Sequence, residues 1–474
     1  MTFPRTAGPP PEPLAWGQRR AWWVLAATVL GSALTFIDGT VVSVALPAVG
    51  ADLAAGSVAL TWVVNAYTLA LAALVLLGGS LGDRYGRRRI FLLGVVVFAA
   101  ASAACGLAGG AAVLVLARAV QGVGAALLTA TSLAILQTSF GPQDRARAIG
   151  AWSGLTGVAS AIGPFAGGWL VQAASWRWVF LVNVPVAVAV VVITRRHVPE
   201  SSNPAACPQL DVPGAALLVG GLGALSYGLT AWGGGVGWPA AGAALAAGAL
   251  LLAAFPVRER RAVSPLVPPA VLVAGPFLAV NAVTLVLYAA LGAVFFVVVV
   301  GLQVGAGFSP LAAALSLLPV TVLMLVFSPS VGVLTSRVGP RLPMTAGPLV
   351  AGLGVALLSR AGPGSDYLLD VLLPAAVFGA GLTLLVTPLT AAALSAVPVE
   401  QAGLASGANN AVARTGSLLA VAAVPLVGGL GGTGLTDPER VRDGYATVMG
   451  ACAALLVAGG ALSAVVVRRP AQRP

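Results

Sequence analysis

Long apolar runs cover most of this 474-residue chain and leave few folds open to it. Each run is much longer than the roughly 4–8 residues of a buried strand. About 20 apolar residues let a helix cross a bilayer, and backbone in lipid must form its hydrogen bonds within its own segment. Only 8% of the residues are charged, whereas about a quarter are charged in a soluble domain. The runs predict an all-α membrane protein and exclude an ordinary soluble enzyme.

The apolar runs divide into fourteen predicted spans. The predicted spans are 21–46, 58–79, 90–108, 112–137, 147–170, 177–194, 212–232, 238–256, 275–300, 309–335, 343–360, 367–394, 405–430 and 444–467. A twelve-span alternative needs residues 195–274 to be soluble, but two runs within that segment are too apolar for this. We therefore expect six helices, two inserted helices and six further helices.

Arginine supplies all 25 basic residues, because the sequence contains no lysine. Cytoplasmic loops of membrane proteins are enriched in basic residues. With the N-terminus in the cytoplasm, only Arg177, Arg360, Arg440 and Arg442 fall in outer loops, and most other arginines fall in inner segments. Both termini are thus expected to be cytoplasmic. The net charge of +11 then needs no nucleic-acid partner to explain it.

The scarcity of some residue types excludes several chemistries. Without lysine, the chain has no Walker A lysine for a nucleotide phosphate and no Schiff-base lysine. The single histidine, His197, leaves no His-rich zinc site. We expect no metal, no organic cofactor and no enzyme activity.

An internal repeat indicates how the spans are grouped. Residues 79–88 (GSLGDRYGRR) follow the second span, and residues 332–341 (GVLTSRVGPR) follow the tenth. Both stretches lie at the cytoplasmic end of the second helix of a six-helix unit. The predicted organisation is a cytoplasmic tail, a six-helix bundle, a linker with two extra helices, a second bundle and a second tail. Their residue ranges are 1–20, 21–194, 195–274, 275–467 and 468–474.

Several motifs resemble those of the major facilitator superfamily. Residues 79–88 resemble its motif between helices two and three. Residues 34–47 (LTFIDGTVVSVALP) resemble the first-helix motif of its fourteen-span drug:proton antiporters, the EmrB/QacA type. Residues 116–126 resemble the fourth-helix motif associated with proton coupling, and residues 150–168 the antiporter motif of helix five. The stretch 176–185 is also similar to this branch.

The resemblance implies two six-helix bundles plus two inserted helices, in a bacterial cytoplasmic membrane. It implies a proton-coupled antiporter that exports lipophilic drugs, dyes or antibiotics by alternating access, with the proton gradient as its energy source. We expect the protein to be a monomer. Its substrate is expected to be cationic or neutral, because Asp38 is the only clear acid deep in a span. The sequence departs from the family pattern at Ala159, where a glycine is expected, and at Ser336, where an acid is expected.

Asp38 and Arg118 are the candidates for proton coupling. An acid inside the membrane is a functional hypothesis by default, because burying it is costly. Asp38 is expected to hold either a proton or a substrate; alternatively, it bonds a nearby hydroxyl and only fixes packing. Arg118 cannot realistically lose its proton. It is expected to change how readily a nearby acid takes up a proton, or to act as a purely structural anchor.

Three further groups of residues are candidates for gating, packing and substrate contact. The gating latch comprises Asp83, Arg84, Gly86, Arg87, Arg88, Arg337 and Arg414. The antiporter motif comprises Gly150, Gly154, Gly163, Pro164, Gly167 and Gly168. The substrate cavity comprises Trp62, Asn65, Tyr67, Gln121, Asn183, Tyr288 and Gln303. Each group has a simpler alternative. The arginines of the latch could serve only to orient the protein in the membrane, and the glycines could serve only close helix packing. The cavity residues could be packing residues or part of an aromatic belt at the membrane interface.

Two other functions compete with export. An uptake carrier for a nutrient or metabolite would share the fold. Only the helix-five motif and the direction of transport distinguish such a carrier from an exporter. A membrane enzyme or a receptor is disfavoured, because the sequence shows no paired carboxylates, metal cluster or nucleophile–base set.

Overall fold

The chain folds into a bundle of membrane-length helices in a computed structural model that describes residues 13–203, 209–267, 275–397 and 402–467. Within these ranges, fourteen helical segments are long and apolar enough to cross a membrane. The predicted all-α fold and the predicted number of spans are thus confirmed. The tail 468–474, residues 1–12 of the other tail, and residues 204–208 and 268–274 of the predicted linker lie outside the described residues.

The first half and the inserted pair comprise nine helices in the described part of the chain. These are α1 (Arg19–Asp52), α2 (Ser57–Tyr85), α3 (Arg87–Gly106), α4 (Ala111–Ser139), α5 (Pro142–Ala173), α6 (Trp178–Leu181), α7 (Asn183–His197), α8 (Val212–Gly233) and α9 (Trp238–Arg261). The sixth span is built from α6 and α7, which are separated at Val182.

The second half follows the same order with more interruptions. Its elements are α11 (Gly275–Val300), the π-helix η1 (Gly301–Gly305), α12 (Pro310–Leu315), α13 (Leu318–Val338), α14 (Arg341–Leu358), the π-helix η2 (Tyr367–Leu372), α15 (Leu373–Ser395), α16 (Ala402–Val427) and α17 (Pro438–Val466). Most helices extend past the predicted spans. For example, α17 begins at Pro438 because Asp437 caps its first turn, so Arg440 and Arg442 lie on this helix and not in a loop.

The two halves repeat one packing scheme. In each half, the second and third helices pack on the fourth: α2 and α3 on α4, and α13 and α14 on α15. The first helix packs on the fifth in the same way, α1 on α5 and α11 on α16. The turn after the second helix has a glycine with positive φ in both halves, Gly86 (105°) and Gly339 (79°). This shared scheme supports the division of the chain into two six-helix halves.

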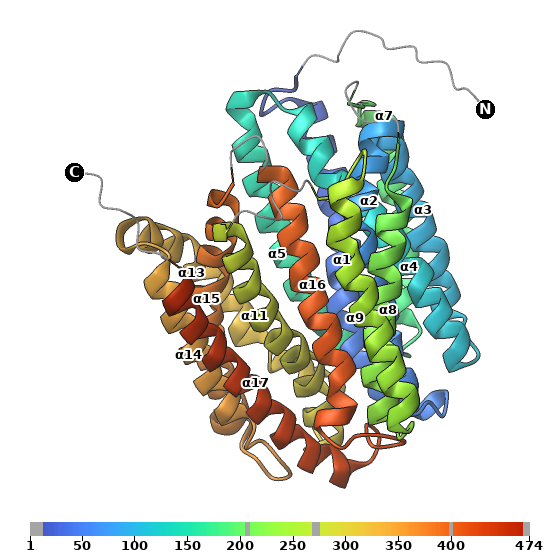
Figure 1. The fold of residues 1–474 in the computed structure, drawn as a ribbon, viewed down its shortest axis with the longest axis vertical. Coiled ribbons are helices and arrows are strands. Elements are labelled where there is room, and N and C mark those ends of the chain that lie inside the picture. Colours follow the sequence, from blue (N-terminus) through green and yellow to red (C-terminus); the bar gives the residue numbers. More distant parts are fainter. Residues whose placement is uncertain (1–12, 204–208, 268–274, 398–401, 468–474) are drawn as a thin grey trace.

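The inserted helices lie against the seam between the halves. Helices α8 and α9 pack on each other, and α8 also packs on α2 of the first half and α16 of the second (Figure 1). The side-chain amide of Asn65 on α2 donates a hydrogen bond to the hydroxyl of Ser226 on α8 at 3.2 Å. Helix α8 is therefore part of the packed structure at the seam, whereas α9 packs mainly on α8.

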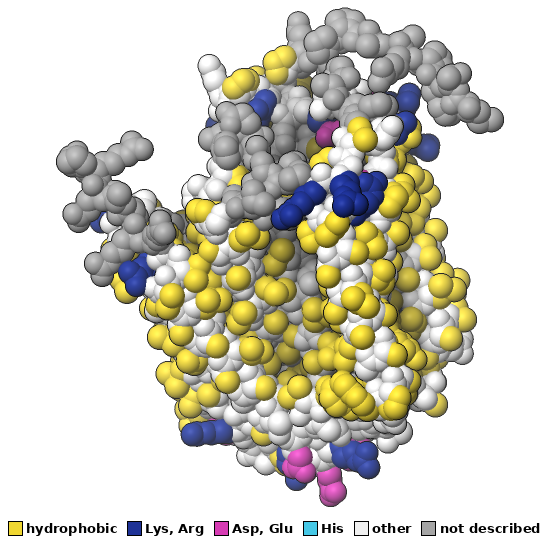
Figure 2. All heavy atoms as spheres, viewed as in Figure 1, with side chains coloured by type: hydrophobic (Ala, Val, Ile, Leu, Met, Phe, Trp, Pro, Cys, Tyr) yellow, Lys and Arg dark blue, Asp and Glu magenta, His cyan; other side chains and the backbone are white. Residues whose placement is uncertain are grey.

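Charge separates the bundle into two ends and an apolar band. On the face drawn in Figure 2, arginines lie toward both ends and apolar side chains cover the surface between them. We call the end at which α1 begins the inner end, because it carries most of the arginines, and we call the opposite end the outer end.

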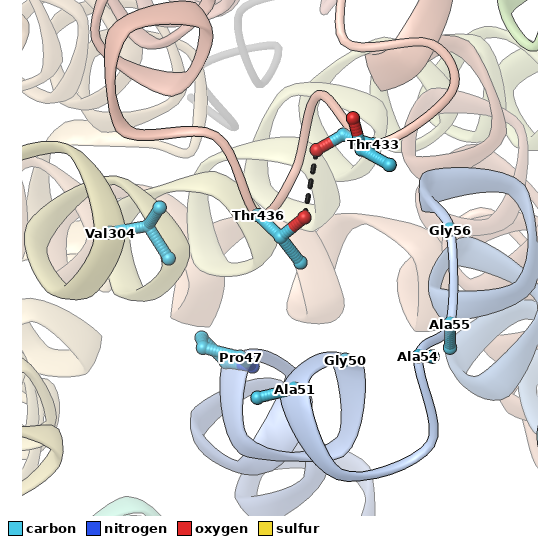
Figure 3. Close-up of a pocket in the computed structure, with 9 residues that line it drawn as sticks. All are labelled: Pro47, Gly50, Ala51, Ala54, Ala55, Gly56, Val304, Thr433 and Thr436. Atoms are coloured by element: carbon cyan, nitrogen blue, oxygen red, sulfur yellow. Dashed lines mark hydrogen bonds between the residues drawn. The ribbon is translucent and has the colours of Figure 1, made fainter.

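The halves meet at the outer end. The amide of Ser57 at the start of α2 donates to the carbonyl of Gly432 in the α16–α17 turn at 2.7 Å. Close to this contact lies a cavity of about 320 Å³, lined by residues from the end of α1, η1 and the α16–α17 turn (Figure 3). Its lining consists of glycine, alanine, proline, valine and threonine, so it offers a ligand no charge.

Candidate functional site

A buried carboxylate lies near the middle of α1. Asp38 has no exposed surface. Its Oδ2 accepts a hydrogen bond from Nη1 of Arg118 at 2.5 Å, and its Oδ1 accepts one from Nε2 of Gln121 at 2.8 Å. Both partners lie on α4, three residues apart, and therefore point to the same side of that helix. The structure thus brings Asp38 and Arg118 together in one ion pair, which we call the Asp38–Arg118 pair.

Arg118 is held by groups from several helices. Its Nε donates to the carbonyl of Val63 on α2 at 3.0 Å, and its Nη1 also donates to Oε1 of Gln121 at 2.7 Å. The guanidinium lies over the ring of Tyr67, 4.2 Å from the ring centre, in a favourable cation–π geometry. The hydroxyl of Tyr67 donates in turn to the carbonyl of Thr35 at 3.0 Å. This network holds the guanidinium in place and supplies hydrogen-bond partners to a charged side chain that is only 1% exposed.

A second ring of polar groups surrounds the pair. The side-chain amide of Asn183, at the start of α7, lies 3.5 Å from Oδ1 of Asp38 and donates to Oγ of Ser102 at 3.1 Å. Ser102 donates to the carbonyl of Phe180 at 2.8 Å. The sequence analysis missed Ser102, because a single serine in an apolar run carries no distinguishing signal.

This arrangement has one group that can exchange a proton. An arginine stays charged, so Asp38 is the member of the pair that can take up a proton. The ion pair is neutral overall and fully hydrogen-bonded, which makes two charges tolerable inside a membrane. Protonation of Asp38 would remove its charge interaction with Arg118. The geometry therefore links proton uptake on α1 to the contact between α1 and α4.

The remaining predicted cavity residues lie elsewhere. Asn65 faces the inserted helix α8. Gln303 in η1 donates to the carbonyl of Val44 on α1 at 3.1 Å and so joins the halves toward the outer end. Trp62 on α2 and Tyr288 on α11 are half-buried. Of the seven predicted cavity residues, the structure places Tyr67, Gln121 and Asn183 around the Asp38–Arg118 pair.

The predicted latch begins with an ion pair across the turn between α2 and α3. Oδ1 of Asp83 at the end of α2 accepts from Nη2 of Arg87 at the start of α3 at 2.6 Å. The guanidinium of Arg84 lies over the ring of Tyr85, 4.8 Å from its centre. Both contacts are local, and both lie at the inner end.

A glutamate that the sequence analysis missed completes this cluster. Oε1 of Glu200, which follows α7, accepts from the backbone amide of Arg88 at 3.0 Å. Its Oε2 forms longer ion pairs with Arg88 (3.8 Å) and Arg89 (3.7 Å). A Cβ at Gly86 would lie 2.7 Å from Oε1 of Glu200. Glycine is therefore favoured there by its positive φ and by the close carboxylate.

The partners found for Asp83, Arg87 and Arg88 lie in the first half or in the segment directly after α7. Asp83 pairs with Arg87, and Asp83, Arg87 and Arg88 each contact residues 198–203, while Arg337 in the second half is exposed. In this conformation the cluster fastens the α2–α3 turn to the segment after α7. A contact of the cluster across the two halves stays a prediction.

Arg414 lies deeper than the sequence suggested. The predicted span placed it near the cytoplasmic end of its helix, but α16 runs from Ala402 to Val427, so Arg414 is halfway along it. The error arose because the predicted span began and ended three residues too late. Nε of Arg414 donates to Oδ1 of Asn410 at 2.9 Å.

The antiporter motif brings α5 against two other helices. A Cβ at Gly163 or Gly167 would collide with α1, at Thr40 and Val41 respectively. A Cβ at Gly168 would lie 2.9 Å from Cα of Leu311, at the start of α12 in the second half. Pro164 lies inside the helix among these glycines. The outer part of α5 therefore packs backbone to backbone against both halves.

The inner part of α5 differs from its outer part. A Cβ at Gly150 or Gly154 would meet no atom within 4 Å. Along α5, contact with the second half is thus concentrated at the outer end.

Replacing Gly168 with valine is expected to disfavour this closed outer contact. Overpacking a tight site costs about 1–3 kcal/mol, which is roughly tenfold or more in a conformational equilibrium. We expect transport to fall about tenfold at unchanged protein abundance in the membrane. Gly154→Val is the matched control, because it introduces the same side chain into the same helix at an open position. An equal loss in both variants would contradict the role of the α5–α12 contact.

Comparison with known proteins identifies a family. The model of the Major Facilitator Superfamily matches residues 28–421. The tetracenomycin C resistance and export protein of Streptomyces glaucescens is 37% identical over 85% of this chain and 75% of its own length. The puromycin resistance protein pur8 of Streptomyces alboniger is 35% identical over 94% of this chain and 89% of its own. The cephamycin export protein CmcT of Amycolatopsis lactamdurans is 36% identical over 91% and 90%.

Solved structures share the fold at much lower identity. The crystal structure of the POT family transporter PepTSo superimposes with a TM-score of 0.70 over 95% of this chain and 98% of that one, at 16% identity. At this identity the likeness establishes the architecture alone.

Proposed function

This chain belongs to the Major Facilitator Superfamily, so it is a multi-pass membrane transporter and not an enzyme, and we propose that it exports lipophilic small molecules in exchange for protons. The observation that carries the proton coupling is the Asp38–Arg118 pair, a protonatable acid sealed in the first half beside a permanent cation. The direction of transport is supported by relatives whose names state resistance or export.

We place the protein in a bacterial cytoplasmic membrane with both termini in the cytoplasm. Most arginines lie at the inner end, and basic residues are enriched on the cytoplasmic side. The contacts between the halves along α5 would then close the extracellular side. Release of these contacts would open that side, as alternating access requires.

The expectation of a cationic substrate loses its basis in this geometry. It assumed that Asp38 is free to bind a cation, but Arg118 and Gln121 occupy both carboxylate oxygens. We therefore propose lipophilic small molecules, including antibiotics and dyes, without a requirement for positive charge.

Inverted membrane vesicles test the direction and the driving force. An imposed gradient with an acidic lumen is expected to drive accumulation of a fluorescent dye in the lumen, because export from a cell becomes uptake in an inverted vesicle. Vesicles without the protein and vesicles treated with a protonophore are the controls. Accumulation in right-side-out vesicles under an inward proton gradient would instead support an uptake carrier and overturn the proposal.

A further inference from the structure

One positive charge in the membrane interior, that of Arg414, has no counter-ion among the residues that the structure describes. The guanidinium of Arg414, halfway along α16, is partly exposed and donates to Asn410 on its own helix. No carboxylate within the described part of the chain lies within 4.0 Å of it. It therefore differs from Arg118, whose charge is balanced by Asp38.

Arg414 lies at the seam between the two halves. Helix α16 belongs to the second half but packs on α2 of the first. Gly407, seven residues earlier and so on the same face of the helix, lies against Leu76 of α2. Tyr288 on α11 lies directly beside this part of α16, because the hydroxyl of Ser417, three residues after Arg414, donates to the backbone carbonyl of Tyr288 at 3.0 Å. Substrate must pass along such a seam when the halves move against each other.

Among the described residues of the membrane interior, the charges do not sum to zero. The Asp38–Arg118 pair is neutral, so Arg414 leaves one net positive charge near the bilayer midplane. Arginine does not relieve this cost by losing its proton, and an unpaired charge in the membrane is both costly and a mark of a substrate pathway. The free guanidinium presents donors in a planar fork that matches a carboxylate or a similar oxyanion.

We propose that Arg414 binds an anionic group of the substrate, so that the transported compounds are lipophilic organic anions carrying a carboxylate, enolate or phenolate. This inference rests on the proposed export function and gives its substrate class. Tyr288, half-buried on α11 beside α16, provides aromatic surface for the apolar part of such a molecule.

A consequence concerns the driving force. Exchange of one entering proton for one departing anion moves two charges in the same electrical direction, whereas exchange for a neutral molecule moves one. The membrane potential contributes about 2.3 kcal/mol per charge per 100 mV. Export of an anion therefore depends more steeply on the membrane potential than export of its neutral analogue.

Binding to the purified full-length protein tests the substrate class without any proton gradient. The probes are the fluorescent 1-pyrenebutyric acid, which carries one carboxylate, and its methyl ester, which has the same ring system and no acidic group. Wild-type protein is expected to bind the acid more tightly than the ester. Arg414→Gln is expected to weaken binding of the acid about tenfold or more, because it loses a charge-assisted hydrogen bond, and to leave the ester unaffected. Arg414→Lys keeps the charge but lacks the planar fork, and is expected to bind the acid more tightly than Arg414→Gln and less tightly than the wild type.

The other outcomes separate this inference from the proposed function. Tighter binding of the ester by the wild type, or an equal loss of both probes in Arg414→Gln, would overturn the anion site. Failure of wild-type vesicles to respond to a proton gradient would overturn proton exchange, but the binding comparison would still decide the substrate class.

Discussion

Replacing Asp38 with asparagine is expected to abolish proton-driven export. Asparagine has nearly the same shape, so the space beside Arg118 stays filled, but it cannot take up or release a proton. Asp38 is the member of its ion pair that exchanges protons, because Arg118 remains charged. We expect dye accumulation in inverted vesicles under an imposed pH gradient to fall to the level of vesicles that lack the protein.

A second acid–arginine pair supplies the control. Asp52 at the end of α1 accepts from Nη1 of Arg177 at 2.7 Å, but its side chain is 44% exposed. Asp52→Asn makes the same chemical change on the same helix outside the membrane interior. We expect it to keep transport within about twofold, since exposed ion pairs contribute little. Normal proton-driven accumulation in Asp38→Asn would show that proton coupling does not run through Asp38.

Most of the fold follows from the length and composition of the apolar runs. A segment in lipid must satisfy its own backbone hydrogen bonds, so each long run has to become a helix, and the helices form where the runs predict them. The ends were less predictable, because caps such as Asp437 extend helices into polar sequence. Hydropathy does not reveal the division of the sixth span at Val182 or the π-helix that contains Gln303.

The members of the site were easier to predict than their arrangement. Asp38 and Arg118 stand out because charges are rare in spans. Their pairing, across 80 residues, depends on how α1 and α4 are rotated. Helices that are apolar on all sides carry little information about rotation, so Gln121 and Asn183 were assigned to a substrate cavity although they surround the pair.

Glu200 could have been found from charge alone. The chain has 14 acidic residues, and Glu200 is one of those that the predicted spans place in the arginine-rich inner segments. Opposite charges at one end of a bundle are expected to pair, and it contacts Arg88 and Arg89. The predicted latch included Asp83 but not Glu200, because Glu200 lies outside the motif at residues 79–88.

Replacing Arg118 with glutamine is expected to reduce both transport and stability. Adding Asp38→Asn to this variant should restore stability but not transport. Removing one partner of a buried ion pair typically costs about 3–5 kcal/mol, because the other charge is left unpaired. Here Asp38 would lose its bond from Nη1, and the carbonyl of Val63 would lose its bond from Nε. Unfolding of the purified protein in detergent titrated with SDS measures the free-energy change.

The double variant Asp38→Asn with Arg118→Gln separates the two roles of the pair. It removes both charges, and neutral replacement of a buried pair is often close to neutral in stability, so we expect its free energy of unfolding to lie closer to the wild type than that of either single variant. Proton-driven export should nevertheless remain absent, because no proton carrier is left at the site. If the double variant were as unstable as the sum of the single ones, Asp38 and Arg118 would act independently. Recovery of export together with stability would mean that the pair is only a packing element, and that protons enter by another route.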